Sequence, residues 1–244
     1  MSKIKLLLLP LLLIVMFPIL LFLGTNSYET IYFSKIWRHR GGEVENNIKS
    51  IRKSIEEGYR GIEVDVRHSS KKLLLSHDPI AKEKKYDSLE DLLISVAPEK
   101  INVWIDLKSI SLVDYINVAS KLGSLLKKTK MDKKAFVESK GVLLNCVLRF
   151  YDVPTVLWYE KKSTDMKNFV YESIIGVLIP LVKIQGISFD KVFSKSKFVK
   201  NSKLKKHWFT FKTDAELEEG CLSKNDVLLT SVSYNKLMMI KNCR

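Results

Sequence analysis

The chain has 244 residues, enough for one barrel of ordinary size and too few for a barrel with another full domain. Its 46% hydrophobic and 28% charged residues are typical of a globular protein with one apolar extension. The formal net charge of +14 suggests attraction to anionic partners such as lipid head groups or phosphodiesters. It is explained equally well by lysines scattered along the chain without a binding role. Nucleic acid is a weaker candidate, because no recognised binding motif accompanies the charge.

The apolar extension lies at the N-terminus. An uncharged run covers residues 6–23, behind a tip that contains lysines. A bilayer is crossed by roughly 20 apolar residues, whereas the apolar part of a secretory signal is normally shorter. We therefore expect residues 1–30 to form an uncleaved transmembrane anchor, with a cleaved signal and a secreted protein as the alternative. The basic tip favours an orientation in which residues 31–244 lie outside the cytosol.

The segment GIEVDV, residues 61–66, predicts a strand with Glu63 and Asp65 on one face and apolar residues on the other. Residues 44–58 have apolar positions at helical spacing and end at a glycine, so the strand follows a helix. A strand in such an α/β layer meets water on neither face unless it lines a barrel. Glu63 and Asp65 must then be paired, protonated or bound to a cation. An ordinary solvent-facing strand is the alternative.

Further polar residues recur at the ends of predicted strands. In residues 101–108, Asp106 and Lys108 share one face of an alternating pattern. His39 ends a strand immediately before a Gly-Gly turn that lets backbone approach a ligand closely, and His77 ends a short apolar strand. A lone histidine is usually an ordinary polar residue, but two of them flanking an acid pair favour a functional site.

Five short motifs together resemble the signature of the glycerophosphodiester phosphodiesterase family: His39-Arg40-Gly41, Glu45-Asn46, Glu63-x-Asp65, His77-Asp78 and Asp106-x-Lys108. The resemblance covers nearly everything after the apolar segment, and the motifs are specific as a set. It implies an α/β fold, a (β/α)8 TIM barrel over residues 31–244, with the active site at the C-terminal ends of the strands.

The resemblance also implies a metal-dependent activity. Glu63, Asp65 and Asp106 would hold one divalent cation, and their oxygen ligands suit Mg²⁺ or Ca²⁺. The implied reaction is hydrolysis of a glycerophosphodiester to glycerol 3-phosphate and an alcohol. The family usually has Glu where this chain has Asp106, so the shorter arm could move the metal or admit a water.

The remaining motif residues have implied roles in proton transfer and phosphate binding. His39 and His77 would be the acid-base pair, with His39 as the base and His77 as the acid. Arg40 and Lys108 would contact the phosphate, Arg40 through two oxygens and Lys108 as a point charge or as a group that orients a carboxylate.

Two other functions stay open. The stretch after Asp78 is brief, so the inserted lobe that shapes substrate choice in many of these enzymes is largely missing. A phospholipase D-like enzyme acting on lysophospholipid or sphingolipid head groups would use the same residues. A non-catalytic, membrane-tethered binding protein with a degenerate site is the other alternative, because Asp106 and residues 44–47 depart from the family pattern.

Downstream, the pattern predicts a helix from Ser88 and barrel strands at 101–108, 135–139, 155–159, 186–189, 207–212 and 227–231, which join strands at 35–39 and 61–67. Residues 73–77 pair with the second strand as a hairpin. The apolar segment 169–182 is either a helix on the membrane surface or one buried against the barrel. His207 is expected to be structural, at the end of the barrel away from the site. Cys146, Cys221 and Cys243 are expected to be inert thiols, with one disulfide left open.

Overall fold

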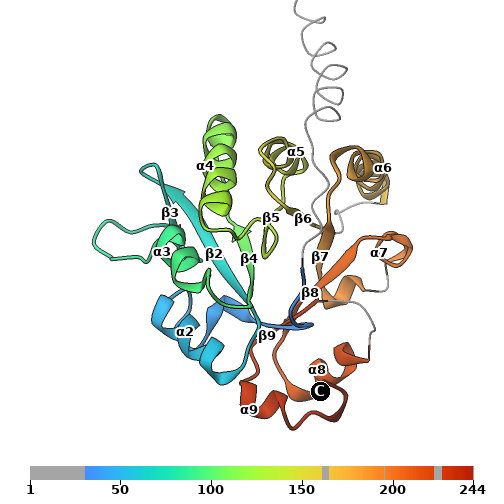
Figure 1. Cartoon of the computed structure of the whole chain (residues 1–244). Helices are drawn as coiled ribbons and strands as arrows, with labels where there is room; N and C mark the ends of the chain where they lie inside the picture. The colour runs from blue at the N-terminus through green and yellow to red at the C-terminus, as the bar shows by residue number, and fades with distance from the viewer. Residues whose placement is uncertain (1–30, 161–164, 195, 223–226, 244) are drawn as a thin grey trace, which may run out of the picture.

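Eight parallel strands close into a barrel, and helices form a ring around it (Figure 1). The computed structural model describes residues 31–160, 165–194, 196–222 and 227–243. The strand order is β1-β9-β8-β7-β6-β5-β4-β2, and the barrel closes where Arg38 of β1 pairs with Ile62 of β2. An additional strand, β3, pairs antiparallel with β2. The predicted TIM barrel and its hairpin strand are therefore confirmed.

The strands lie within two residues of the predicted segments at each end, but His39 and His77 were expected to end strands and instead follow β1 and β3. The barrel strands are β1 (Ile36–Arg38), β2 (Gly61–Ser69), β4 (Asn102–Leu107), β5 (Ala135–Ser139), β6 (Thr155–Trp158), β7 (Gly186–Asp190), β8 (Lys205–Phe211) and β9 (Val227–Thr230), with β3 at Lys72–Leu75. They could be predicted because a barrel strand is covered on both faces and so selects short apolar runs.

Helices follow the strands in the order that a barrel requires. They are α2 (Ile48–Glu57), α3 (Leu89–Val96), α4 (Tyr115–Lys128), α5 (Val142–Phe150), α6 (Asp165–Val182), α7 (Lys197–Asn201), α8 (Asp214–Cys221) and α9 (Tyr234–Leu237). Single 3-10 turns lie at η1 (His39–Gly41), η2 (Leu112–Asp114), η3 (Lys191–Phe193) and η4 (Lys241–Cys243).

Capping residues set the ends of the first helices. The side chain of Asn47 accepts a hydrogen bond from Ser50 N and starts α2, so this helix begins later than the periodicity predicts. Gly58, with φ of 124°, ends it. Ser88 caps α3 as predicted, but the Asp91 carboxylate accepts from the Ser88 hydroxyl and does not complete a capping box through the backbone.

Aromatic rings fill the floor of the barrel, at the N-terminal ends of the strands. The imidazole of His207 is fully buried there, with its ring centroid 4.6 Å from that of Phe136 and 5.1 Å from that of Trp104. Burial lowers the pKa of His207 to about 3, so the ring is neutral. The predicted structural role of His207 is consistent with this packing.

The first described residues are attached to the same floor. The Asn102 side chain, at the start of β4, accepts from Phe33 N and donates to Ile31 O. Ile31 N donates to Lys133 O, just before β5. The predicted anchor, residues 1–30, lies outside the described residues. Among those that are described, no helix combines the length and hydrophobicity needed to cross a bilayer.

A disulfide closes the C-terminal end of the chain. Cys221 at the end of α8 is bonded to Cys243 in η4, with Cα atoms 5.1 Å apart. The expectation of inert thiols was wrong for this pair, because their 22-residue separation matches no motif and only the fold brings them together. Cys146 is a buried free thiol, as expected.

Candidate active site

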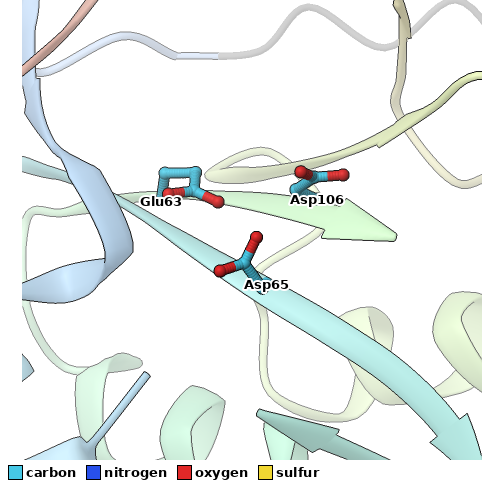
Figure 2. A group of neighbouring side chains, drawn as sticks. All are labelled: Glu63, Asp65 and Asp106. Atoms are coloured by element: carbon cyan, nitrogen blue, oxygen red, sulfur yellow. The ribbon is translucent and has the colours of Figure 1, made fainter. Parts of the chain in front are cut away.

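Three carboxylates meet inside the barrel where β2 and β4 pair (Figure 2). Each of Glu63, Asp65 and Asp106 offers one oxygen, and these oxygens lie within 4.8 Å of one another. Asp65 and Asp106 are paired in register on neighbouring strands, which puts their side chains next to each other. All three residues are at most 8% exposed. The alternation read from the sequence therefore does turn these acids into the barrel.

Burying these three carboxylates together costs free energy when no cation is bound. Burial raises the pKa of Glu63 well above the usual range, and the charges of Asp65 and Asp106 raise it further. Burial also raises the pKa of Asp106. Clustered carboxylate oxygens of this kind are the ligands that hard divalent cations prefer, so the donor set fits such an ion. No second group of this type occurs in the described part of the chain.

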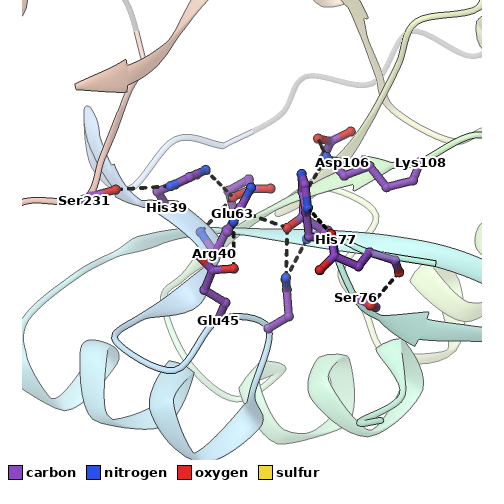
Figure 3. A network of polar contacts seen from close by, with 12 residues as sticks. His39, Arg40, Glu45, Glu63, Ser76, His77, Asp106, Lys108 and Ser231 are labelled. Atoms are coloured by element: carbon purple, nitrogen blue, oxygen red, sulfur yellow. Dashed lines mark hydrogen bonds and ion pairs between the residues drawn. The ribbon is translucent and has the colours of Figure 1, made fainter. Parts of the chain in front are cut away.

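Lys108 lies against two of the three acids. Its ammonium is 2.6 Å from Asp65 Oδ1 and also contacts Asp106 Oδ2 (Figure 3). Burial opposes a charged lysine, but the pull of Asp106 and Asp65 outweighs it and raises the pKa of Lys108. Lys108 therefore orients two of the carboxylates and neutralises part of their charge.

The turn after β1 places His39 and Arg40. Arg40 and Gly41 have φ values of 49° and 72°, in the left-handed region. A Cβ on Gly41 would lie 2.2 Å from Cγ1 of Ile51 in α2, so the glycine is needed for this close approach. The close approach that the structure shows at this turn is to α2. The turn also directs Arg40 N to Glu63 Oε2 at 2.8 Å.

His39 lies beside the acids, as predicted. Its Nδ1 is 3.2 Å from the Ser231 hydroxyl, and its Nε2 is 4.0 Å from Glu63 Oε2 (Figure 3). Burial, together with the positive charge of Arg40, lowers the pKa of His39 to about 4. The imidazole is therefore neutral at ordinary pH and can accept a proton.

His77 reaches the same place from the loop after β3. Its Nδ1 is 2.9 Å from Asp78 Oδ1, and 44% of its side chain is exposed. Its carbonyl accepts two hydrogen bonds from the Arg67 guanidinium, which fixes the loop. His77 is thus the more accessible of the two imidazoles.

Arg40 is held by carboxylates on both sides. One terminal nitrogen donates to Glu45 Oε2 at 2.7 Å, and Nε is 3.3 Å from Asp65 Oδ2. Glu45 is more than half exposed, so the pair lies at the rim of the site. The guanidinium can exchange this partner for another anion at small cost, because exposed ion pairs contribute little.

One cavity of about 140 Å³ brings all seven predicted residues together. Its wall consists of His39, Arg40, Glu63, Asp65, His77, Trp104, Asp106, Lys108, Glu138, Trp158, Phe209, Thr210 and Leu229. We call this the active-site cavity. A larger cavity of about 500 Å³ adjoins it and shares His77, Asp106, Lys108 and Trp158.

Some residues of the site were not assigned a role from the sequence. Asn46 was noted within a motif, and Glu138 and Ser231 were placed in predicted strands without a role. A signal for Glu138 did exist, because it is an acid in an apolar strand, the same feature that singled out Glu63 and Asp65. Ser231 carries no comparable signal and is found only through its contact with His39.

A scan against protein-family models gives no match, and neither does a search of curated proteins. Solved structures of similar fold include a glycerophosphodiester phosphodiesterase from Parabacteroides distasonis, with a TM-score of 0.67 at 16% identity, covering 88% of this chain and 98% of that one. A glycerophosphodiester phosphodiesterase from Agrobacterium tumefaciens has a TM-score of 0.62 at 15% identity, covering 84% and 98%. A phosphodiesterase from Oleispira antarctica, in complex with the product sn-glycerol-3-phosphate, has a TM-score of 0.67 at 13% identity, covering 84% and 96%. At these identities the likeness establishes the shared fold.

Proposed function

We propose that this protein is a metal-dependent phosphoric diester hydrolase of the glycerophosphodiester phosphodiesterase family, which converts a glycerophosphodiester into glycerol 3-phosphate and an alcohol. The observation that carries the proposal is convergence: three buried carboxylates and two imidazoles from separate segments line one cavity. The similarity in fold supports it, and the Oleispira antarctica relative was solved with sn-glycerol-3-phosphate.

Glu63, Asp65 and Asp106 are proposed to hold one divalent cation, Mg²⁺ or Ca²⁺. Such an ion would supply positive charge to the phosphate oxygens and make a nearby substrate hydroxyl more acidic. Asn46 and Lys108 hold Asp65 in place from two sides, so the carboxylates are oriented before substrate arrives.

The two imidazoles divide the proton transfers. His39 is proposed as the base, because its lowered pKa keeps the ring neutral and the contact of Nδ1 with Ser231 leaves Nε2 free to accept a proton. His77 is proposed as the acid that protonates the leaving alcohol, since it lies where the two cavities join. In this scheme a glycerol hydroxyl gives its proton to His39 and attacks the phosphorus, while the departing alcohol oxygen receives a proton from His77. Water then opens the resulting cyclic phosphate to glycerol 3-phosphate in the reverse sense: the water gives a proton to His77, and the released glycerol oxygen takes one from His39.

Arg40 and Lys108 are proposed to bind the phosphate. Arg40 would exchange its exposed partner Glu45 for a phosphate oxygen, using its fork geometry. The adjoining cavity is proposed to receive the alcohol. Its lining combines apolar side chains, including Ile110 and Leu144, with Lys140, whose ammonium lies 3.9 Å from the centre of the Trp158 ring.

A turnover assay with glycerophosphocholine and each divalent ion tests this function. We expect a chelator to abolish product formation, and His39→Ala and His77→Ala each to lower kcat by about 10²-fold or more. His68→Ala is the matched control, because His68 lies outside the active-site cavity and should leave turnover unchanged. Turnover that resists chelation, or full activity in both variants, would contradict the proposal.

A lipid substrate is a second candidate, favoured by the outer surface of α6. Met166, Phe169, Val170, Ile174 and Val177 recur at helical spacing, and each is between 48% and 72% exposed. Ile175 and Val182 on the opposite face are fully buried. The helix thus has both features that the sequence left as alternatives: it packs on the barrel and also presents an apolar stripe outward.

Lysines line a groove along another part of α6, which none of the stripe residues enters. These are Lys183, Lys197 and Lys203, and the groove, of about 650 Å³, lies between α6 and α7. We propose that an anionic bilayer or micelle is the partner of the outer surface of α6, because apolar side chains on one face with lysines on another are typical of helices that lie in a lipid interface. This surface would bring lysophospholipid or sphingolipid head groups to the same catalytic residues.

Soluble and micellar substrates distinguish the two candidates. If the substrate is a lipid, the variant Phe169→Ser/Val177→Ser should lose turnover of micellar lysolipid and keep that of glycerophosphocholine. Met239→Ser is the control, since Met239 is 77% exposed but follows α9, which lies away from α6 in the ring of helices (Figure 1). Equal turnover of lysolipid by both variants would exclude the proposed role of α6.

The remaining proposals concern residues 1–30 and the loss of catalysis. We propose that residues 1–30 anchor the barrel, residues 31–244, to a membrane with the catalytic domain outside the cytosol, or direct its secretion after cleavage. Protease protection in intact cells tests the orientation.

A non-catalytic binding protein would bind Mg²⁺ or Ca²⁺ in calorimetry and form no product from any diester.

A further inference from the structure

A fourth carboxylate, Glu138, lines the active-site cavity from the neighbouring strand β5. In the sheet, Asp65 pairs with Asp106 and Asp106 pairs with Glu138, so three adjacent strands each present an acid at the same level. Paired positions in a parallel sheet direct their side chains to the same face. Glu138 therefore shares the barrel interior with the three carboxylates already described.

The carboxylate of Glu138 is only partly satisfied, because it interacts with the side chains of Ser188 and Trp104 while one of its oxygens has no partner in the part of the chain that the structure describes. The residue is only 2% exposed, and its Oε2 has no hydrogen-bond partner among the described residues. A buried carboxylate oxygen without a partner is costly, so such oxygens are normally paired with a donor or a metal. The oxygen lies in the wall of the cavity where the cation is proposed to bind.

Glu138 stands next to Asp106 in the sheet and beside the three acids whose oxygens lie within 4.8 Å of one another, without being one of them. The family that the motifs resemble usually has Glu at the position of Asp106, one methylene longer, and here Asp106 is in addition held by Lys108. Glu138, adjacent to Asp106 in the sheet, has the longer arm. A longer carboxylate one strand away can compensate for the shortened one.

The charges in the cavity agree with this arrangement. The active-site cavity holds more acidic than basic side chains, since four carboxylates, from Glu63, Asp65, Asp106 and Glu138, face Arg40 and Lys108. A divalent cation would offset this excess of acidic groups. Buried charge is tolerated when it is paired in this way.

Resting on the metal-dependent function proposed above, we propose that Glu138 is a fourth carboxylate ligand of the divalent cation and replaces the reach lost at Asp106. Its role is then to hold the ion, and the longer side chain on β5 takes over the position that a glutamate on β4 would otherwise occupy.

Calorimetry with Ca²⁺ and with Mg²⁺ on the full chain tests this assignment. Glu138→Gln keeps the shape and removes the charge, and we expect the Kd of the ion that binds more tightly to rise by about tenfold or more. Glu138→Asp, with a shortened arm, should also weaken binding. The decisive variant is Asp106→Glu/Glu138→Gln, which restores the long arm on β4 and should recover most of the lost affinity.

Glu90→Gln is the control, because Glu90 is an exposed acid paired with Lys128 on the surface. The rise in Tm on adding saturating ion is an independent readout, and it should be smaller in both single Glu138 variants than in the wild type. An unchanged Kd and an unchanged rise in Tm would overturn the assignment and leave Glu138 as a structural residue. A wild-type chain that binds neither ion would instead overturn the metal-dependent function itself.

Discussion

The side chain of Asn46 makes two hydrogen bonds to Asp65, one with its carboxylate and one with its backbone N–H, and we call this pair of bonds the clamp. Asn46 Nδ2 donates to Asp65 Oδ2 and Asn46 Oδ1 accepts from Asp65 N, both at 2.8 Å. Asn46 itself has a φ of 56°, a conformation that asparagine tolerates better than most residues. The loop after β1 therefore fixes one carboxylate of β2 in a single orientation.

We expect Asn46→Ala to release Asp65 and to weaken divalent-ion binding by about 10- to 100-fold. Calorimetry on the folded variant measures this. Asn47→Ala is the matched control, because it removes the cap of α2 and should cost about 1 kcal/mol of stability while leaving the ion affinity unchanged. Equal affinities in the two variants would show that the clamp has no role in ion binding.

Lys108 should stabilise the protein most when no divalent ion is present. Lys108→Met leaves Asp65 and Asp106 without their ammonium partner, and breaking a buried pair of this kind costs about 3–5 kcal/mol. A bound cation would replace part of the lost charge. The variant should therefore lose more of its Tm in a chelator than in excess Mg²⁺ or Ca²⁺, as thermal unfolding will show. The same loss in both conditions would argue that Lys108 and the ion do not share these carboxylates.

His207 should make the fold sensitive to acid. Its pKa in the folded protein is about 3, below the ordinary value of 6.5, so the unfolded chain binds a proton that the folded one excludes. The stability from neutral His207 is complete above pH 6.5 and is lost as the pH falls toward 3, by up to about 1.4 kcal/mol per pH unit.

Urea unfolding at several pH values between 7 and 4 measures this dependence. His207→Phe, which keeps an aromatic ring among Trp104 and Phe136, should reduce the pH dependence by about one proton. The dependence that remains should come from other groups such as His39, whose pKa is lowered to about 4. An unaltered slope in the variant would mean that His207 is already protonated in the folded protein or that it never titrates.

The disulfide should affect stability and leave the site intact. Cys221→Ser/Cys243→Ser opens a loop of 22 residues, and chain entropy predicts a loss of about 3 kcal/mol. The active-site cavity includes neither cysteine, so kcat should not change. Thiol titration of the wild type in denaturant should find one free thiol, that of Cys146. Three reactive thiols without reductant would show that the bond does not form.

The pattern of short apolar runs and period-two alternation predicted most of the strands, because each barrel strand is short and largely apolar. A carboxylate within such a strand is easily recognised in the sequence. For this reason the sequence alone singles out Glu63, Asp65 and Asp106. Three-dimensional proximity could not be predicted in the same way. The pairing of Cys221 with Cys243, the contact of Ser231 with His39 and the place of Glu138 beside Asp106 all depend on closure of the barrel, which joins residues distant in sequence.

The attachment of residues 31–33 to the floor of the barrel has a consequence for how the molecule would meet a membrane. Asn102 holds these residues at the N-terminal ends of the strands, whereas the cavity opens at the other end. If residues 1–30 anchor the protein as proposed, a tether that leaves from the floor would point the opening away from that bilayer when the barrel stands upright. With the outer stripe of α6 on the lipid instead, the barrel would lie on its side, and its opening would face along the membrane plane toward diesters that diffuse past.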